Sequence, residues 1–296
     1  MILCRKDWIK EAMTGKRGAM RTGLIIEGGG MRGFFSAGIL KVLADEQLEF
    51  PYAIGISSGS LNLLAFAHDM DKASPLFFEG DRKGFLRLRN LRHPSRGLLD
   101  TDRFFERVPD AYPWLENISP DWHIAAVRAE TAEIVYWPLG SFRDGEELRD
   151  HIRASASIPV LMPRAYIGGD VYVDGGIIDS IPIRKVLDDG VQKAVLILTR
   201  KKGYRKRKQT IGLYLRRWLK PYPQLRKAME TRHERYNQAL EQVERLEEQG
   251  RIFVFRPEVH RLGRMQYAQA KAEQTYLDGV AIAERRLTEL KAYLES

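Results

Sequence analysis

The stretch that decides the fold is residues 23–60, GLIIEGGGMRGFFSAGILKVLADEQLEFPYAIGISSGS. Its apolar run at 23–27 leads into three consecutive glycines, and apolar residues at helical spacing follow over 34–47. A second apolar run at 52–56 ends in a sharp glycine-containing turn before a second helix over 60–68. Two buried strands that each lead through glycines into a helix predict a parallel α/β sheet.

The remainder of the chain extends this pattern less regularly. We expect a hairpin from 122–128 and 133–137, with further strands at 170–173, 193–199 and 251–255. A short helix is expected to begin at Asp100 or Thr101. Longer helices are predicted over 146–155, 182–189, 224–249 and 265–294.

Composition limits the class of protein. The chain has 296 residues, of which 44% are hydrophobic and 29% charged, and this excludes a disordered or fibrous protein. The single cysteine, Cys4, excludes an intramolecular disulfide framework and a Cys-rich zinc site. No apolar stretch reaches the length of a membrane span or of a signal-peptide core, so we expect any membrane association to be peripheral.

The sharpest motif is Gly55-Ile56-Ser57-Ser58-Gly59, a G-x-S-x-G sequence between a predicted strand and a predicted helix. In that context the serine sits on a tight turn with its hydroxyl held out above the sheet, and the glycines allow close packing around it. The helix that follows directs its N-terminal amides toward the same place, which favours developing negative charge. The pattern therefore indicates a nucleophilic serine, against the alternative of a glycine-rich turn that happens to contain one.

A second motif precedes it, and its members are Gly28, Gly29, Gly30, Met31, Arg32 and Gly33. It satisfies the G-x-G-x-x-G pattern of dinucleotide-binding proteins. Such a protein would carry an acidic residue at the tip of the second strand, where this chain has Ser57, and this argues against NAD. Glycine amides at a helix start also bind the oxyanion of an acyl intermediate, and Arg32 adds a positive charge nearby.

The base that would activate the serine is open from the residues alone. His260 follows a predicted strand and is a candidate for a conventional Ser-His-Asp triad. Asp174, in Val173-Asp174-Gly175-Gly176, closes another predicted strand at a tight turn, where sites of open α/β sheets are built. Asp170 and Asp179 have similar surroundings, and D-G-G is also a common turn signal.

The ordered set G-G-G-x-R-G, G-x-S-x-G and D-G-G resembles the patatin-like phospholipase family over residues 22–200, and residues 154–159 (ASASIP) resemble the segment that precedes the family's aspartate. The resemblance implies a three-layer α/β/α fold and hydrolysis of lipid acyl esters of the phospholipase A or lysophospholipase type, without metal or cofactor. It also implies a dyad of Ser57 and Asp174 without histidine. The implied oxyanion hole and supporting glycines are Gly28, Gly29, Gly30, Arg32 and Gly33, with Gly55, Gly59, Gly175 and Gly176.

The resemblance divides the chain into an N-terminal extension (1–21), a catalytic domain (22–200) and a mainly helical C-terminal extension (201–296) that packs on the core. The formal charge of +9 is concentrated at 200–227, which holds 12 basic residues and no acidic one. Aromatic residues interleave with Arg216, Arg217 and Lys220, as in interfacial membrane helices.

Nucleic acid would attract the same charges. Beside a lipid hydrolase, however, the basic segment favours an anionic membrane surface over nucleic acid. We therefore expect a cytoplasmic protein that acts on phospholipid or another acyl-ester lipid, attached peripherally to the inner face of the membrane. A third possibility, of another class, is a catalytically idle module that binds anions or membranes.

Overall fold

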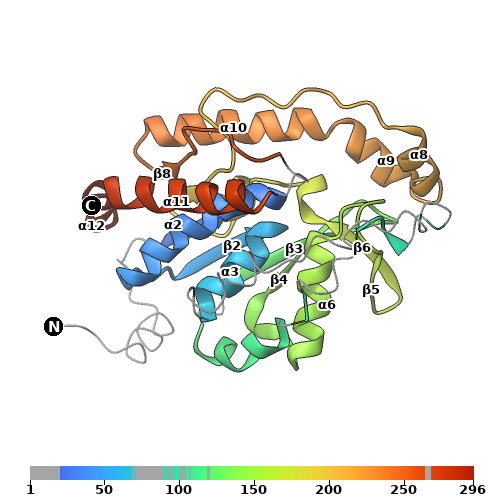
Figure 1. Cartoon of the computed structure of the whole chain (residues 1–296), viewed down its shortest axis with the longest axis horizontal. Coiled ribbons are helices and arrows are strands. Elements are labelled where there is room, and N and C mark those ends of the chain that lie inside the picture. Colours follow the sequence, from blue (N-terminus) through green and yellow to red (C-terminus); the bar gives the residue numbers. More distant parts are fainter. Residues whose placement is uncertain are drawn as a thin grey trace.

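A computed structural model describes residues 21–68, 70, 90, 93, 96–99, 105–106, 108–118, 121–263 and 268–296. Figure 1 shows the course of the chain. The N-terminal extension expected over 1–21 lies outside the described residues except for Arg21, as does the helix start expected at Asp100 or Thr101.

The described strands form one mostly parallel sheet. Its eight strands are β1 (Thr22–Ile26), β2 (Tyr52–Ile56), β3 (Trp122–Arg128), β4 (Ile134–Pro138), β5 (Ala165–Ile167), β6 (Asp170–Asp174), β7 (Lys193–Ile197) and β8 (Ile252–Phe255). Hydrogen-bonded neighbours follow the order β5-β6-β3-β2-β1-β7-β8, and β4 also pairs with β3. The pairs β1–β2, β2–β3, β1–β7 and β7–β8 are parallel, whereas β4, β5 and β6 join antiparallel. The predicted α/β sheet and the hairpin of β3 and β4 are confirmed.

Helices and short 3-10 turns connect these strands. The α-helices are α2 (Gly33–Asp45), α3 (Ser58–His68), α6 (Gly145–Ala156), α7 (Ile183–Asp188), α8 (Leu213–Trp218), α9 (Pro223–Glu230), α10 (Arg232–Glu248), α11 (Gln269–Arg285) and α12 (Leu287–Glu295). The 3-10 turns are η1 (Gly30–Arg32), η4 (Val108–Asn117), η5 (Leu139–Ser141) and η6 (Gly175–Ile177).

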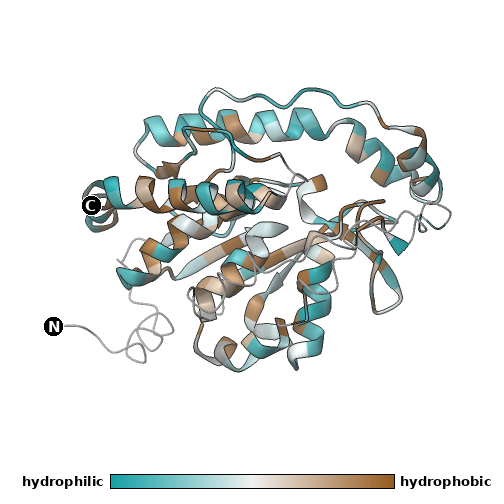
Figure 2. Ribbon diagram, in the orientation of Figure 1, coloured by the Kyte–Doolittle hydropathy of each residue, from teal (hydrophilic) through white to brown (hydrophobic). Residues whose placement is uncertain are grey.

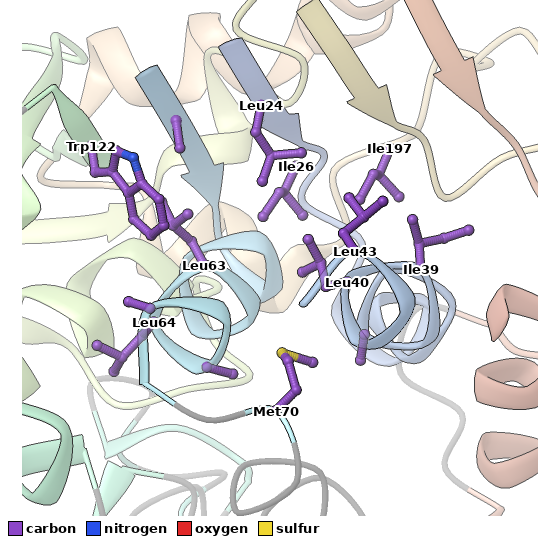
Figure 3. Packing of buried hydrophobic residues seen from close by; sticks show 14 of the residues in the cluster. Leu24, Ile26, Ile39, Leu40, Leu43, Leu63, Leu64, Met70, Trp122 and Ile197 are labelled. Atoms are coloured by element: carbon purple, nitrogen blue, oxygen red, sulfur yellow. The ribbon is translucent and has the colours of Figure 1, made fainter. Parts of the chain in front are cut away.

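Alternation along β1 shows how the helices form two layers around the sheet. Leu24 and Ile26, both fully buried, share one apolar cluster with Leu40 of α2 and Leu63 of α3 (Figure 3). Ile25, between them, belongs to a second cluster with residues of α7 and α10. Successive side chains of a strand point to opposite faces, so α2 and α3 cover one face and α7 and α10 the other. The three-layer α/β/α architecture expected from the resemblance is therefore observed.

The C-terminal residues contribute to this core. Strand β8 extends the sheet by pairing with β7, and the buried Leu240 and Val243 of α10 face the second cluster. Helix α11 lies against α2, where a Cβ at Gly38 would come within 2.1 Å of Tyr276 O (Figure 1). In Figure 2, α10 and α11 carry alternating hydrophilic and hydrophobic colours, as expected of helices with one buried face.

Two predicted helices are wrong in extent. The helix expected over 224–249 is divided at Thr231 into α9 and α10, and the one expected over 265–294 is divided at Arg286 into α11 and α12. At the first break, Thr231 Oγ1 bonds to Lys227 O, and Arg235 donates to Ala228 O. Side chains that compete for helical carbonyls in this way disturb the regular ladder, a local effect that apolar periodicity does not reveal.

The aromatic part of the basic segment is arranged differently from an interfacial helix. Trp218 is only 2% exposed, and the guanidinium carbon of Arg164 lies 4.8 Å from its ring centroid. Leu213 and Tyr214, at the start of the short helix α8, are exposed instead. Within the described part of the chain, no helix has both the length and the apolar character needed to cross a bilayer.

Candidate active site

Ser57 occupies the turn between β2 and α3 with φ of 57°, a left-handed backbone that non-glycine residues adopt rarely. The chain can turn so sharply because glycines stand on both sides. A Cβ at Gly55 would lie 2.3 Å from Gly59 O, and a Cβ at Gly59 would lie 2.4 Å from Ile26 O. Both contacts are with backbone, which cannot move aside. The G-x-S-x-G motif thus forms a strained strand-to-helix turn with the serine at its apex.

The register of β3 brings Asp174 to this turn. Ile56, the last residue of β2, is opposite Ala125, and Asp174, the last residue of β6, is opposite Ala126. Strand β4 pairs with β3 across both positions. Because β4 occupies one edge of β3, β2 and β6 must share the other edge, and their carboxyl ends meet there. Gly175 is packed into this junction, since a Cβ on it would lie 2.6 Å from Ala125 O.

The two side chains are in direct contact. Ser57 Oγ donates to Asp174 Oδ2 at 2.9 Å, and Gly176 N donates to Asp174 Oδ1 at 2.7 Å. Ser57 is 2% exposed and Asp174 is fully buried. One carboxylate oxygen is therefore held by the backbone of the D-G-G turn while the other accepts the serine hydroxyl. This arrangement can move a proton from the hydroxyl to the carboxylate.

The C-terminal end of α6 and the residue that follows it accept hydrogen bonds from the backbone amides of both Ser57 and Asp174. Ser57 N donates to Ser155 Oγ at 3.2 Å, and the Ser155 hydroxyl also lies 2.6 Å from Ser60 Oγ. Two residues further on, Ser157 O accepts from Asp174 N at 2.9 Å. The segment that sequence reasoning connected with the aspartate thus contacts the serine as well.

The glycine loop, formed by residues 28–33, runs directly beside Ser57. A Cβ at Gly28 would lie 2.9 Å from Ile56 O, a backbone atom, and 3.1 Å from Ser57 Cβ, so glycine permits this close approach. Gly29 N donates to Ser58 Oγ at 2.9 Å. Among the residues that the structure describes, the amides of Gly30 and Met31 at the start of η1 donate to no acceptor. These two amides are the donors that an oxyanion could use.

A buried polar cluster lies under this loop. Glu27, only 1% exposed, accepts from Thr199 N at 2.5 Å and from Thr199 Oγ1 at 2.9 Å. Arg32 Nε donates to Thr199 Oγ1 at 3.3 Å, so at least this part of the guanidinium faces the cluster. Gly29 touches the same threonine, because a Cβ on it would lie 2.9 Å from Thr199 Oγ1. The cluster therefore holds the loop that flanks Ser57.

The other candidates lie elsewhere. His260 is exposed, and its Nε2 lies 3.1 Å from Arg200 Nη1 rather than at Ser57. Partial burial and the neighbouring Arg200 lower the pKa of His260. Asp170 pairs with Arg128, and Asp179 accepts from Tyr136 Oη at 3.0 Å. Of the three aspartates that the residues alone left open, Asp174 is the one that contacts the serine.

Sequence reasoning did not identify several polar residues that support the turns and the glycine loop around the site. They are Glu27, Ser58, Thr199, Arg232, Arg235 and Tyr236. An acidic residue at the end of an apolar strand, immediately before the glycines, was a visible signal for Glu27. No group of three or more His, Cys, Asp or Glu side chains in the described part of the chain is arranged to hold a metal ion.

Comparison with known proteins bears on this geometry. The family model described as patatin-like phospholipase matches residues 24–187, which include the glycine loop, Ser57 and Asp174. The chain belongs to the patatin-like phospholipase family. A second model, described as a domain of unknown function (DUF6363), matches residues 222–295.

Curated relatives of this patatin-like protein match part of their own length. The uncharacterized protein YjjU of Escherichia coli is 29% identical over 60% of this chain and 52% of YjjU. Lysophospholipase NTE1 of Yarrowia lipolytica is 26% identical over 57% of this chain and 12% of NTE1. This chain therefore spans about half of YjjU and a small part of NTE1. Among solved structures, VipD from Legionella pneumophila aligns with a TM-score of 0.49 at 13% identity, over 92% of this chain and 67% of VipD.

Proposed function

We propose that the protein hydrolyses acyl esters of lipids, with Ser57 as nucleophile and Asp174 as its base. The observation that carries the proposal is the 2.9 Å hydrogen bond from Ser57 Oγ to Asp174 Oδ2 at a strained strand-to-helix turn. Membership of the patatin-like phospholipase family supports lipid esters as the substrate class. The relative named lysophospholipase NTE1 supports a lysophospholipid as the first substrate to try.

The mechanism follows from the contacts. As Ser57 Oγ attacks the ester carbonyl carbon, its proton passes to Asp174 Oδ2, and the oxyanion accepts hydrogen bonds from the amides of the glycine loop. The carbonyl re-forms as the alcohol leaves with the proton from Asp174, which leaves an acyl group on Ser57. Water then gives a proton to Asp174 and attacks the acyl carbon, and the fatty acid departs as the proton returns to Ser57 Oγ.

Labelling with a fluorophosphonate, together with hydrolysis of p-nitrophenyl butyrate and a lysophosphatidylcholine, tests the proposal. The wild-type protein should be labelled at Ser57 and should turn over both esters. Ser57→Ala and Asp174→Asn should each lose turnover by about 10³-fold or more. Asp170→Asn is the matched control, since it changes an aspartate of the same strand that pairs with Arg128 on the surface. An unlabelled wild-type protein would support the catalytically idle binding module instead.

The triad alternative makes the opposite prediction for two variants. Because His260 faces Arg200, His260→Ala should keep nearly full activity. A protein that loses turnover with His260→Ala and keeps it with Asp174→Asn would be a conventional triad esterase.

We further propose that the protein meets an anionic membrane surface through residues 200–227. Leu213 is 84% exposed, and Tyr214 is also exposed beside Arg216 and Arg217. An exposed apolar side chain flanked by cations is the pattern of an interfacial contact, and each cation near anionic lipid contributes about 1 kcal/mol. Part of the basic segment is already occupied within the protein, since Arg205 pairs with Glu244.

Co-sedimentation with vesicles tests this surface. The wild-type protein should bind phosphatidylglycerol vesicles and bind phosphatidylcholine vesicles much less. The triple variant Arg216→Gln, Arg217→Gln, Lys220→Gln should lose this preference for phosphatidylglycerol vesicles. Equal loss in a triple variant with Arg184→Gln, Arg245→Gln and Lys271→Gln, which removes three exposed cations outside the segment, would show that only total charge matters.

A further inference from the structure

An arginine of α10 donates hydrogen bonds to the turn that follows Asp174. Arg232 Nε donates to Gly176 O at 2.6 Å, and Arg232 Nη2 donates to Ser180 Oγ at 3.2 Å. Ser180 Oγ itself donates to Gly176 O at 2.7 Å. Gly176 is the residue whose N–H donates to Asp174 Oδ1. Gly176 therefore accepts a hydrogen bond from Arg232 through its carbonyl oxygen and donates one to Asp174 through its amide. These two bonds link α10 to the carboxylate.

A second arginine of α10 holds the continuation of the same turn. Arg235 Nη2 donates to Ile177 O at 3.1 Å and Nε donates to Ile178 O at 3.2 Å. Arg235 Nη1 donates to Thr231 Oγ1 at 2.7 Å, which fixes the guanidinium from the residue that precedes α10. Because the planar guanidinium presents its donors in a fixed fork, these bonds set the orientation of the turn as well as its distance from α10.

The neighbouring residue on α10 reaches the other side of the site. Tyr236 Oη donates to Glu27 Oε1 at 2.7 Å, and both residues are buried. Burial and the charge of Glu27 raise the pKa of Tyr236, so its hydroxyl stays protonated and able to donate. Glu27 directly precedes the glycine loop and holds Thr199, against which Gly29 packs. A buried carboxylate is costly unless hydrogen-bonded, so Tyr236 is part of what keeps it there.

These three residues of α10 lie on one face of the helix, because positions i, i+3 and i+4 are neighbours on a helix surface. Figure 1 shows α10 running along the upper side of the sheet, whereas α3 and α6 lie along the lower side. The helix lies within residues 222–295, which the second family model matches and the patatin-like model does not. We propose that Arg232, Arg235 and Tyr236 are positioning residues for the Asp174 turn and the glycine loop, so that the C-terminal unit completes the catalytic centre. This inference rests on the proposed function of Ser57 and Asp174.

Kinetics of α10 variants test the positioning role. Arg232→Gln and Arg235→Gln should lower kcat for p-nitrophenyl butyrate by about tenfold or more, with KM changed less than about twofold, because a displaced base impairs the chemical step. Fluorophosphonate labelling of Ser57 should slow by a similar factor. Tyr236→Phe should act in the same direction through the glycine loop. Arg232→Lys, which retains the charge without the fork, should recover part of the loss.

Arg245→Gln is the matched control, since Arg245 is an exposed arginine of the same helix. It should leave kcat, KM and labelling unchanged. A kcat loss of the same size in this variant would overturn the proposal, because the effect would then belong to the stability or charge of α10 as a whole.

Hydrogen exchange gives a readout that does not depend on activity. Ile178 N and Asp179 N both donate to Gly175 O, so their exchange reports on the turn. The peptide spanning 174–182 should exchange faster in Arg232→Gln and in Arg235→Gln than in wild type and in Arg245→Gln. Unchanged exchange in this peptide, or unchanged kcat, overturns the positioning role. A wild-type protein that is unlabelled and inactive overturns the proposed function itself, and the exchange of the peptide then still shows whether α10 holds the turn.

Discussion

Ser57 Oγ lies 2.9 Å from Asp174 Oδ2 although the two residues are 117 positions apart in the chain. The contact arises because β2 and β6 end at adjacent positions on one edge of β3, where Ile56 is opposite Ala125 and Asp174 is opposite Ala126. Backbone hydrogen bonds therefore fix the distance between the two side chains. We therefore expect substitutions in the turns around the site, and in the residues that hold those turns, to alter activity, as substitutions of Ser57 and Asp174 themselves should.

The left-handed backbone of Ser57 predicts a conflict between stability and activity. A left-handed conformation costs a non-glycine residue about 1–2 kcal/mol, and glycine avoids that cost but loses about 0.5–1 kcal/mol through its freer unfolded chain. Ser57→Gly should therefore be more stable than Ser57→Ala by about 0.5–1 kcal/mol, while both are inactive. Urea unfolding of the two variants measures the difference. Equal or reversed stabilities would contradict a strained turn at this position.

The Ser155 hydroxyl is predicted to support the turn that carries Ser57. Ser155→Ala leaves the buried Ser57 N without its acceptor and removes the contact with Ser60 Oγ. An unsatisfied buried amide costs about 1–3 kcal/mol, and we expect kcat to fall about tenfold as the turn relaxes.

The neighbouring Ser157 provides the control for this prediction. Its hydroxyl donates to Arg153 O, and its contact with Asp174 is made by the main-chain oxygen. Ser157→Ala should therefore keep kcat within about twofold. If the two alanine variants show the same kcat, then the Ser155 hydroxyl has no part in holding Ser57.

The close approach of Gly59 to β1 predicts a large effect of one methyl group. A Cβ at Gly59 would lie 2.4 Å from Ile26 O, a backbone atom of a central strand. Gly59→Ala should lower the free energy of unfolding by about 3 kcal/mol, as overpacking of a rigid core does. Gly140→Ala is the control, because its nearest atom would be Leu115 O at 3.9 Å, and its effect should stay within about 0.5 kcal/mol. Chemical denaturation compares the two, and a tolerated Gly59→Ala would show that β1 and α3 can separate.

The partly buried Asp179 predicts a pH-dependent stability difference. Burial raises the pKa of Asp179 above its ordinary value of 3.8, against the opposing effects of the Tyr136 hydroxyl and Arg235. The folded protein thus keeps this proton over a range of pH in which the unfolded chain has released it, so stability falls as pH rises through that range. Asp179→Asn removes this loss, and its stability relative to wild type should increase from about pH 4 upward. Denaturation at several pH values between 3.5 and 7 measures this, and a pH-independent difference would contradict it.

The residues alone indicated Ser57 as the candidate nucleophile but left its candidate base open. The pattern around Ser57 combines a strand, flanking glycines and a helix, all of which are local. Asp170, Asp174 and Asp179 look alike in the sequence, and what separates them is the register of β6 on β3. The resemblance to the patatin-like family named Asp174, and the structure brings that carboxylate to the serine.

The C-terminal half shows where periodicity gives incomplete information. Residues 224–249 carry a helical pattern, and a helix is present, but the break at Thr231 and the burial of Tyr236 are not visible in the pattern. Polar residues that bond to distant segments look in the sequence like residues of a solvated helix face. Likewise, the sequence around Trp218 is typical of an interfacial helix. The residue that packs over the Trp218 ring, Arg164, lies 54 positions earlier in the chain, where no local pattern connects the two.

The sequence by itself determined the parallel α/β sheet, the strained serine turn, the glycine loop and the family, because each depends on residues that are close together along the chain. Only the tertiary structure decided that β2 and β6 end against each other, that Glu27 and Thr199 underlie the glycine loop, and that Arg232, Arg235 and Tyr236 of α10 contact both sides of the site. The hydrogen bonds among them join residues that lie between 56 and 209 positions apart in the chain. They are set by how the whole sheet and its two helical layers pack, which no local pattern records.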